Sequence, residues 1–534
     1  MKRQLSGIMR FLKIRLNGAS SPRIRKGKPQ LPLRHRYWPL SYLVGILLCL
    51  ILFSLLAHKV TLQKEEMLHA RTVFGDNLLP TPWHWHDNPL GPHAFTWERS
   101  VDIKKCSFHS WIPTFPRTAG SLEARPSNSS CPQFFEWIRS DLAPWKKSGI
   151  TKRNVEVTKD SAAFRVTIVK GRLYLDVYYS CVQTRALFTV WGILLLLEKY
   201  KGLVPDVDLM FDCMDRPRIS RTETYSDLES PPVLFRYCST KSHYDIPFPD
   251  WSFWGWSETK LEPWDEQREK IAKASASTSW KSKTRKAFWR GNPDVGSPLR
   301  MELLKCNNAS GWYASRSEIQ NQNWDDERAA ETENWKSKLE NQCNHRYKIY
   351  AEGFAWSVSF KYIMACGSPT LAISPKYHDF FSRGLKSYVH YMPVRPSEIC
   401  ASKLCPSINT AVDWAESNPK KAMAIGKTGQ EFLRRDLSMN NVYDYMYHLI
   451  SEYARLQTYK PVVPESAEEI TQNFIMCLAQ PQLGSLLQKS REAMIVGTIP
   501  CHMSNSKKES FQTNDWEAKE QEQVDWSEKQ CNFR

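Results

Sequence analysis

A carboxylate that directly follows an apolar strand is the first feature of this chain that could do chemistry. The segment 207–213 is strongly apolar, and the chain leaves it at Asp215, followed by the rigid exit Arg216-Pro217. A carboxylate at a strand end that faces a cleft can serve as a general base. The alternative is a loop aspartate that caps backbone amides. These residues alone leave both interpretations open.

A glycine-containing loop and an arginine after it form a candidate anion site. Phe288–Asn292 (FWRGN) is expected to be a strand that leaves into a loop, where backbone N–H groups at Gly291 and Asn292 can approach phosphate oxygens. Arg300, in the first turn of the next helix, offers a forked, permanently charged partner for a diphosphate. A surface arginine on a helix is the commoner alternative.

The segment Gly353–Lys361 (GFAWSVSFK) is a second candidate anion site. A strand–turn–helix junction here places free amides and the hydroxyls of Ser357 and Ser359 at a helix N-terminus. An ordinary serine N-cap explains the same pattern equally well.

The run Pro249–Trp256 contains Trp251, Trp254 and Trp256 within six residues. Indole faces stack well on sugar rings, but tryptophans also fill cores. We expect core packing for at least one of the three.

Asp206 and Asp208 form a DxD pattern, which in one class of glycosyltransferase holds a divalent metal and a nucleotide diphosphate. That pattern normally ends an apolar strand, whereas here it precedes Leu209-Met210-Phe211. The carboxylates therefore fall at the wrong end for a cleft, and no metal site is assigned.

Alternating helices and strands must position these residues. A hairpin around Lys170-Gly171 is predicted, and the later half repeats the alternation of helices and strands. The pattern predicts an α/β fold with two Rossmann-like halves and a cleft between them, where ligands bind at the carboxyl ends of the strands. The expected elements are strands at 164–178, 207–213, 286–292, 346–353 and 368–374 and helices at 184–200, 356–366 and 411–457, the last with an apolar stripe at Ala415, Ala422, Ala424, Ile425, Phe432 and Leu433.

The N-terminal region predicts a membrane anchor. Residues 1–36 hold eleven of the seventeen net positive charges and no acidic residue, and the apolar run Trp38–Ala57 is long enough to cross a bilayer as a helix. The positive-inside rule then places the N-terminus in the cytosol and the remainder in the lumen. The rule also explains the basic charge, and nothing indicates a nucleic-acid partner.

Cysteine usage agrees with a secretory compartment. Thirteen cysteines are scattered from Cys106 to Cys531 without a CxxC pair, which indicates disulfides rather than a metal site. The odd number leaves at least one cysteine free or paired with another chain, and Cys366 in IMACGS is the candidate free thiol. Asn128 and Asn308 are N-glycosylation acceptors.

The predicted organisation has six parts. The Pro-, His- and Trp-rich stretch after the anchor is interpreted as a stem rather than a metal site. The parts are a cytosolic basic tail (1–37), a transmembrane signal-anchor helix (38–57), the stem (58–105), a first Rossmann-like, acceptor-side domain (106–275), a second Rossmann-like, donor-binding domain with C-terminal helices (276–470), and a partly disordered extension (471–534).

These motifs together resemble the Rumi-like protein O-glucosyltransferases of glycosyltransferase family 90. Their sequences are most similar to those of the plant branch. They occur in family order over roughly residues 200–460. The matching pieces are MDRPRI, YDIPFPDWSFWGW, AFWRGN…SPLR, RYKIYAEGFAWSVSFKYIMACGSPTL and FFSRGLKSYVHYMPV.

The resemblance implies a GT-B-like fold and an inverting transfer from a UDP-sugar without an essential metal. Asp215 then matches the catalytic base, Arg300 the arginine at the UDP diphosphate, and Gly291 and Asn292 the donor loop. Ser357 falls in the helix-start segment that contacts the nucleotide. Acceptors would be hydroxyls of a secreted protein or a cell-wall polysaccharide, and the sugar would be xylose, glucose or galactose.

One position departs from the family pattern. Animal members have an arginine where this chain has Ser359, so the positive charge is missing or comes from Lys361 or Arg290. A degenerate, sugar-binding or scaffolding member is the alternative function. The chain ends without a KDEL-like signal, which with the anchor favours the Golgi membrane over the endoplasmic reticulum, and such anchored transferases often form homodimers.

Overall fold

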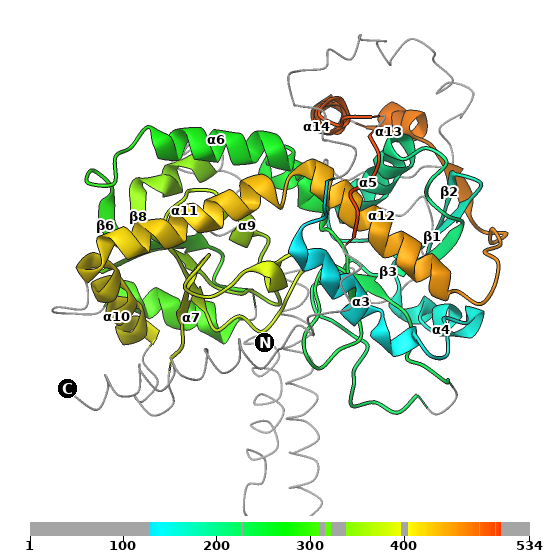
Figure 1. The fold of residues 1–534 in the computed structure, drawn as a ribbon, viewed down its shortest axis with the longest axis horizontal. Coiled ribbons are helices and arrows are strands. Elements are labelled where there is room, and N and C mark those ends of the chain that lie inside the picture. Colours follow the sequence, from blue (N-terminus) through cyan, green and yellow to red (C-terminus); the bar gives the residue numbers. More distant parts are fainter. Residues whose placement is uncertain are drawn as a thin grey trace, which may run out of the picture. The chain divides into compact units, whose positions relative to one another are not determined.

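A computed structural model describes residues 129–225, 228–295, 297–308, 316–321, 338–396, 404–479, 481–496 and 498–503. Two sheets, each flanked by helices, make up the described chain (Figure 1). The predicted tail, span 38–57 and stem, the acceptor Asn128 and the side chain of Asn308 lie outside the described residues. Within the described ranges, no helix combines the length and the apolar character needed to cross a membrane.

The first sheet has six strands and mixed direction. Its order is β11 (Glu468–Ile470), β2 (Arg172–Val177), β1 (Phe164–Val169), β3 (Val207–Phe211), β4 (Phe235–Arg236) and β5 (Ile246–Pro247). The pairs among β11, β2, β1 and β3 are antiparallel, and β3, β4 and β5 are parallel. This half therefore departs from the parallel, Rossmann-like sheet expected from the sequence, because a tight hairpin forces antiparallel pairing.

The hairpin between β1 and β2 forms where it was predicted. Lys170 and Gly171 both have positive φ, 51° and 72°, the combination that a two-residue hairpin turn requires. Beyond the turn, Ile168 faces Leu173 and Val166 faces Leu175, and these four side chains are buried. The apolar alternation of the strands and the turn residues therefore agree on one register.

The second sheet is parallel throughout its described pairs. Its order is β10 (Met392–Val394), β9 (Thr370–Ile373), β8 (His345–Tyr350), β6 (Thr284–Gly291) and β7 (Ser317–Asn321). The predicted strands at 286–292, 346–353 and 368–374 are confirmed. Because parallel strands end at the same edge, the loops after β6 and β8 lie next to each other.

Helix α5 (Arg185–Lys199) is buried against the first half because its side chains are apolar around most of the circumference. It contacts α12 (Met439–Leu456), α13 (Gln472–Leu478) and α14 (Pro481–Glu492). Gly192 allows the Trp254 ring to lie against α5, since a Cβ atom at Gly192 would fall 2.3 Å from that ring. The helix predicted at 184–200 is confirmed.

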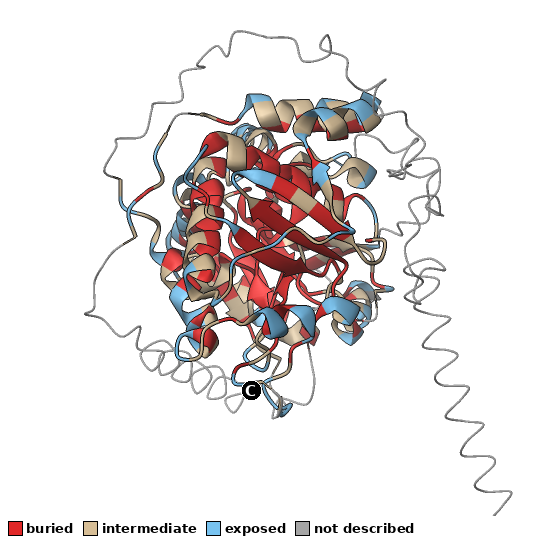
Figure 2. Cartoon of the chain, turned by 90° about the vertical axis from the view of Figure 1, so that its right-hand side faces the viewer, coloured by how far each residue is buried: buried red, intermediate tan, exposed pale blue. Residues whose placement is uncertain are grey.

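The second sheet is covered by α6 (Trp264–Ala276), α7 (Pro298–Leu304), α9 (Ser359–Met364), α10 (Leu404–Ser417) and α11 (Pro419–Arg435). The segment predicted as helical at 411–457 comprises α10, α11 and α12, and its apolar stripe is buried except at Ala424. Short helices α3 (Trp137–Asp141) and α4 (Lys152–Glu156) pack in the first half. Figure 2 shows buried strands enclosed by helices whose outer faces are exposed.

Four disulfides join described cysteines: Cys131–Cys501, Cys181–Cys213, Cys306–Cys405 and Cys343–Cys366. Cys366 was predicted to be a free thiol, and this is wrong: the turn after α9 brings it within 5.1 Å, Cα to Cα, of Cys343. The described cysteine that remains free is the buried Cys238. Sequence spacing could not identify this pairing because the two partners lie on different elements.

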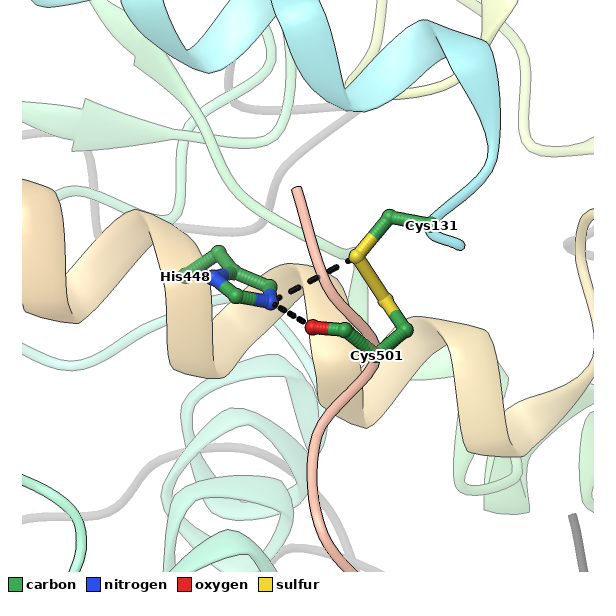
Figure 3. Close-up of side chains that lie close together, drawn as sticks. All are labelled: Cys131, His448 and Cys501. Atoms are coloured by element: carbon green, nitrogen blue, oxygen red, sulfur yellow. Dashed lines mark hydrogen bonds between the residues drawn. A yellow bond between two sulfur atoms is a disulfide. The ribbon is translucent and has the colours of Figure 1, made fainter. Parts of the chain in front are cut away.

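The Cys131–Cys501 disulfide joins two positions 370 residues apart (Figure 3). His448 of α12 lies beside it, with Nε2 2.8 Å from the Cys501 carbonyl oxygen and 3.5 Å from Cys131 Sγ. In the described residues, this is the one grouping of three or more His, Cys, Asp and Glu with ligand atoms close enough for a metal ion. Both sulfur atoms are in the disulfide, so neither is the thiolate that a metal requires.

Candidate active site

Asp215 lies in the loop after β3, two residues beyond the disulfide-bonded Cys213. Its side chain is 19% exposed, and Oδ1 accepts a hydrogen bond of 2.6 Å from Arg185 Nη1. The backbone carbonyl of Asp215 accepts from the Cys238 thiol at 3.1 Å. The carboxylate predicted at a strand end is therefore held in place while it keeps contact with solvent.

Arg300 occupies the first turn of α7, as predicted, and its guanidinium is bound by backbone carbonyl groups. Nε, Nη1 and Nη2 donate to the carbonyl oxygens of Glu352, Asn292 and Ala351 at 3.1, 2.9 and 3.2 Å. Burial lowers the pKa of Arg300 to about 10, which still leaves it charged at neutral pH. These bonds use three of the five N–H groups of the guanidinium within the described part of the chain.

The loop that carries Asp215 contacts the loop after β8, whose carbonyl groups at Ala351 and Glu352 bind Arg300. Arg216, the residue after Asp215, donates from Nε to the Phe354 carbonyl oxygen at 3.1 Å, and its guanidinium lies 3.8 Å from the centre of the Phe354 ring. Burial lowers the pKa of Arg300, and Tyr350, Asp215 and Glu352 oppose part of this lowering through their charges. The structure thus brings the candidate base and the candidate diphosphate partner into one electrostatic environment.

The predicted donor loop follows β6. Gly291 ends the strand, and a Cβ atom there would lie 2.8 Å from the Trp289 ring. Asn292 Oδ1 accepts from the Asp294 backbone N–H at 2.8 Å, which shapes the turn, and its carbonyl accepts from Arg300. Arg290 is half-buried in the same strand. The loop after β6 and Arg300 are therefore joined by a hydrogen bond.

Ser357 and Ser359 lie together at the start of α9. Their Oγ atoms are 2.8 Å apart, and the Ser357 backbone N–H donates to the Tyr350 hydroxyl at 3.2 Å. These are the hydroxyls that the sequence placed at a helix start. The helix itself begins only at Ser359 and is six residues long.

Lys361, one predicted source of the positive charge that Ser359 lacks, is buried in an ion pair. Its side chain is 1% exposed, and Nζ donates to Ser252 Oγ at 2.7 Å and pairs with Asp250 at 3.3 Å. Its contribution to donor binding stays a prediction, and α9 directs this side chain inward against the 250–252 segment. Burial also lowers its pKa.

The three predicted stacking tryptophans differ in exposure. Trp254 is fully buried, with its indole N–H 3.0 Å from the Tyr443 hydroxyl, so its ring packs in the core and offers no exposed face. Trp251 is also buried, with its ring under the Arg185 guanidinium at 4.2 Å, which rules out stacking on a sugar by that face. Trp256 is half-buried and lies 5.2 Å from Trp251, centre to centre.

Both carboxylates of the DxD pattern accept hydrogen bonds from other groups of the protein. Asp208 lies inside β3, is fully buried, and accepts hydrogen bonds from Arg165 and from the Tyr459 hydroxyl. Asp206 accepts from the Lys170 backbone N–H of the hairpin turn at 2.6 Å. The pair precedes the end of β3 that carries Asp215, as the sequence indicated.

Arg185 and Glu352 were missed by sequence reasoning. Arg185 is the first residue of α5, and a charged residue at the head of an apolar helix was the available signal. Glu352 accepts backbone N–H groups of Lys376 and Tyr377, and burial raises its pKa to about 7. The partners of Arg185 and of Glu352 lie more than 20 residues away in the sequence, so residue spacing could not reveal these contacts.

The chain is similar to known glycosyltransferases. Glycosyl transferase family 90 matches residues 126–529, which is most of the chain. O-glucosyltransferase rumi of Drosophila pseudoobscura pseudoobscura is 29% identical over 65% of this chain and 82% of its own length. The rumi homolog of Aedes aegypti is 28% identical over 70% and 90%, and human protein O-glucosyltransferase 1 is 25% identical over 62% and 82%. The chain therefore belongs to glycosyl transferase family 90, as a Rumi-like member.

Proposed function

We propose that this protein is an inverting O-glycosyltransferase that moves a sugar from a UDP-sugar to a hydroxyl group of a secreted protein. The names of its relatives support a protein acceptor and a glucose donor. UDP-xylose and UDP-galactose, and a cell-wall polysaccharide acceptor, are the other outcomes to test. A GT-B-like arrangement, with the donor at the second sheet and the acceptor at the first, fits the parallel second sheet.

The observation that carries this proposal is the pairing of roles at the Asp215–Arg300 site. Among the described residues, Asp215 Oδ2 accepts no hydrogen bond, so it is available to a substrate proton. Arg300 is a fixed cation, and two of its five N–H groups make no hydrogen bond to the described residues, which suits charge that develops on a leaving diphosphate.

The reaction follows from these two roles. Asp215 Oδ2 takes the proton of the acceptor hydroxyl as its oxygen bonds to the anomeric carbon of the sugar. The bond from that carbon to the diphosphate oxygen breaks, and its electron pair leaves with UDP. Arg300 stabilises the UDP charge without a metal ion, and attack opposite the leaving group inverts the configuration.

UDP release tests the proposal. The full chain, made in a eukaryotic secretory host and kept in detergent, is incubated with a panel of UDP-sugars and hydroxyl acceptors, with and without EDTA. We expect release from one donor that survives EDTA and is lost in Asp215→Asn. Loss with EDTA would move the chemistry to a metal. If no donor and acceptor pair gives UDP release, the protein would instead be a non-catalytic sugar-binding or scaffolding member.

We further propose residence in the Golgi membrane with the catalytic part in the lumen. The basic tail before residues 38–57 and the disulfides of the described chain support this placement. Protease treatment of intact microsomes should remove only the N-terminal tail. Digestion of the whole chain without detergent would contradict a lumenal catalytic part.

A further inference from the structure

We propose that Arg185 is a positioning residue for Asp215: it fixes carboxylate oxygen Oδ1 so that Oδ2 faces the acceptor hydroxyl. This inference rests on the proposed function, in which Asp215 is the base. It adds a residue from a different element, the first residue of α5, 30 positions earlier in the chain.

One nitrogen of Arg185 binds both the base and the backbone that carries it. Nη1 donates to Asp215 Oδ1 at 2.6 Å and to the Cys213 carbonyl oxygen at 3.1 Å. The carboxylate is thereby fixed relative to its own loop. Because one carboxylate oxygen is occupied, the orientation of the other is set, which is what proton abstraction from a bound hydroxyl requires.

Arg185 is itself held on its other side. Its guanidinium carbon lies 4.2 Å from the centre of the Trp251 ring, and Trp251 packs edge-on against Tyr237 at 5.0 Å and Trp256 at 5.2 Å. The side chain of Arg185 is only 10% exposed. This aromatic support explains why Trp251 is buried in a segment that otherwise looked suited to sugar binding.

A disulfide joins the two segments that bear the pair. Cys181, four residues before Arg185, is bonded to Cys213, two residues before Asp215. The start of α5 is further held by Glu258, whose carboxylate accepts from the backbone N–H and the hydroxyl of Thr184, both at 2.9 Å. The support of the base is therefore built from rigid, cross-linked parts, as a preorganised site needs.

The geometry predicts a loss in turnover rather than in donor binding. Without the guanidinium, Asp215 can rotate away from its productive orientation, and misplacement of a reacting group by about 1 Å costs about 100-fold in rate. Arg185 makes no contact with Arg300 or with the loop after β6 in the described structure, so UDP affinity should not change. Lysine at this position keeps one charged donor and should recover part of the rate.

The test compares kcat, donor KM and UDP affinity for the full chain and three variants. Arg185→Gln should lower kcat about 100-fold with unchanged KM and UDP affinity, and Arg185→Lys should fall between it and the parent protein. Arg383→Gln is the matched control, because Arg383 also pairs with an aspartate, Asp141, and lies over a tryptophan ring, Trp137, at 4.4 Å. It should lose stability and keep kcat.

A double variant separates positioning from general destabilisation. In an Asp215→Asn background, Arg185→Gln should cost little further, because the group it positions is already gone. An Arg185→Gln protein that binds UDP normally and turns over at the parent rate overturns the inference and leaves the proposed function intact. Turnover retained in Asp215→Asn, or absent in the parent protein, overturns the proposed function and this inference with it.

Discussion

Arg300 shows how a cation can be made rigid at the scale of one residue. Its three hydrogen bonds reach the carbonyl groups of two different loops, and Gly353 leaves no Cβ atom, which would otherwise lie 3.0 Å from Nη2. Carbonyl oxygens attract the guanidinium without cancelling its formal charge. The charge is therefore retained for an anion that approaches the same loops.

Arg300→Lys should reduce kcat/KM roughly 100-fold, the typical cost of removing one preorganised donor to developing charge. Lysine has a single nitrogen and cannot bind the carbonyls of Asn292, Ala351 and Glu352 together. Steady-state kinetics with the identified donor measure the effect. Lys305→Gln is the control, since Lys305 follows the same helix but pairs with Glu302 at an exposed position. An Arg300→Lys enzyme with parent kinetics would contradict this role.

Glu352 should make stability depend on pH. Burial raises its pKa from 4.5 to about 7, so the folded protein binds this proton more tightly than the unfolded chain does. The resulting stabilisation is complete below about pH 4.5 and is lost as the pH rises through about 7. From pH 5 to 8, the parent protein should lose roughly 2–3 kcal/mol relative to Glu352→Gln in urea unfolding. A difference that stays constant with pH would argue against a raised pKa.

Residue identities were predictable where the chemistry is local. Asp215 and Arg300 stand at a strand exit and in a first helical turn, and both signals lie within a few residues. Cys366 was assigned wrongly because its partner, Cys343, is set by how α9 packs, and the pairing of Lys361 with Asp250 depends on the same packing. Arg185 was not predicted because its partner, Asp215, lies 30 residues away in the sequence.

At the scale of elements, close approach of backbones fixes α11 against the second half. A Cβ atom at Gly426 would lie 2.4 Å from the Gly367 carbonyl oxygen, and one at Gly429 would lie 2.5 Å from that of His390. Gly426 thus lets α11 lie directly on the turn between α9 and β9, and Gly429 lets it lie on the segment before β10. That turn also carries Cys366 and its disulfide.

Glycine-to-alanine changes in two helices should have opposite effects. Gly426→Ala should destabilise the protein by roughly 1–3 kcal/mol, since the new methyl group meets backbone that cannot move freely. Gly484→Ala in α14 should stabilise it by up to about 1 kcal/mol, because the nearest atom, Ala479 Cβ, is 3.9 Å away and alanine favours helix. Chemical unfolding of both variants measures this. Equal shifts would mean that α11 tolerates separation from the turn.

Most elements could be predicted because their patterns are local. The hairpin, α5 and the strands of the second sheet follow from apolar runs and turn residues. The order of the first sheet could not, since β11 pairs with β2 across nearly 300 residues and β4 and β5 have only two residues each. Such pairings depend on tertiary packing rather than on strand propensity.

At the scale of the whole described chain, the last part returns to the first sheet. Helix α12 contacts α3, α5 and β3, and β11 extends the sheet beside β2. The Cys131–Cys501 disulfide then closes this return next to His448. Segments from both ends of the described chain therefore support the half that carries Arg185 and Asp215.

Removing the Cys131–Cys501 disulfide should lower the free energy of unfolding more than removing a disulfide that closes a short loop. Cys131→Ser/Cys501→Ser opens a link over 370 residues, whereas the control, Cys343→Ser/Cys366→Ser, opens one over 23. Because a cross-link mainly restricts the unfolded chain, the loss should be larger for the long loop by roughly 2 kcal/mol, after allowing for the other disulfides within it. Urea unfolding without reductant compares the two. Equal losses would mean that local packing around the sulfur atoms, rather than chain closure, sets the contribution of each disulfide.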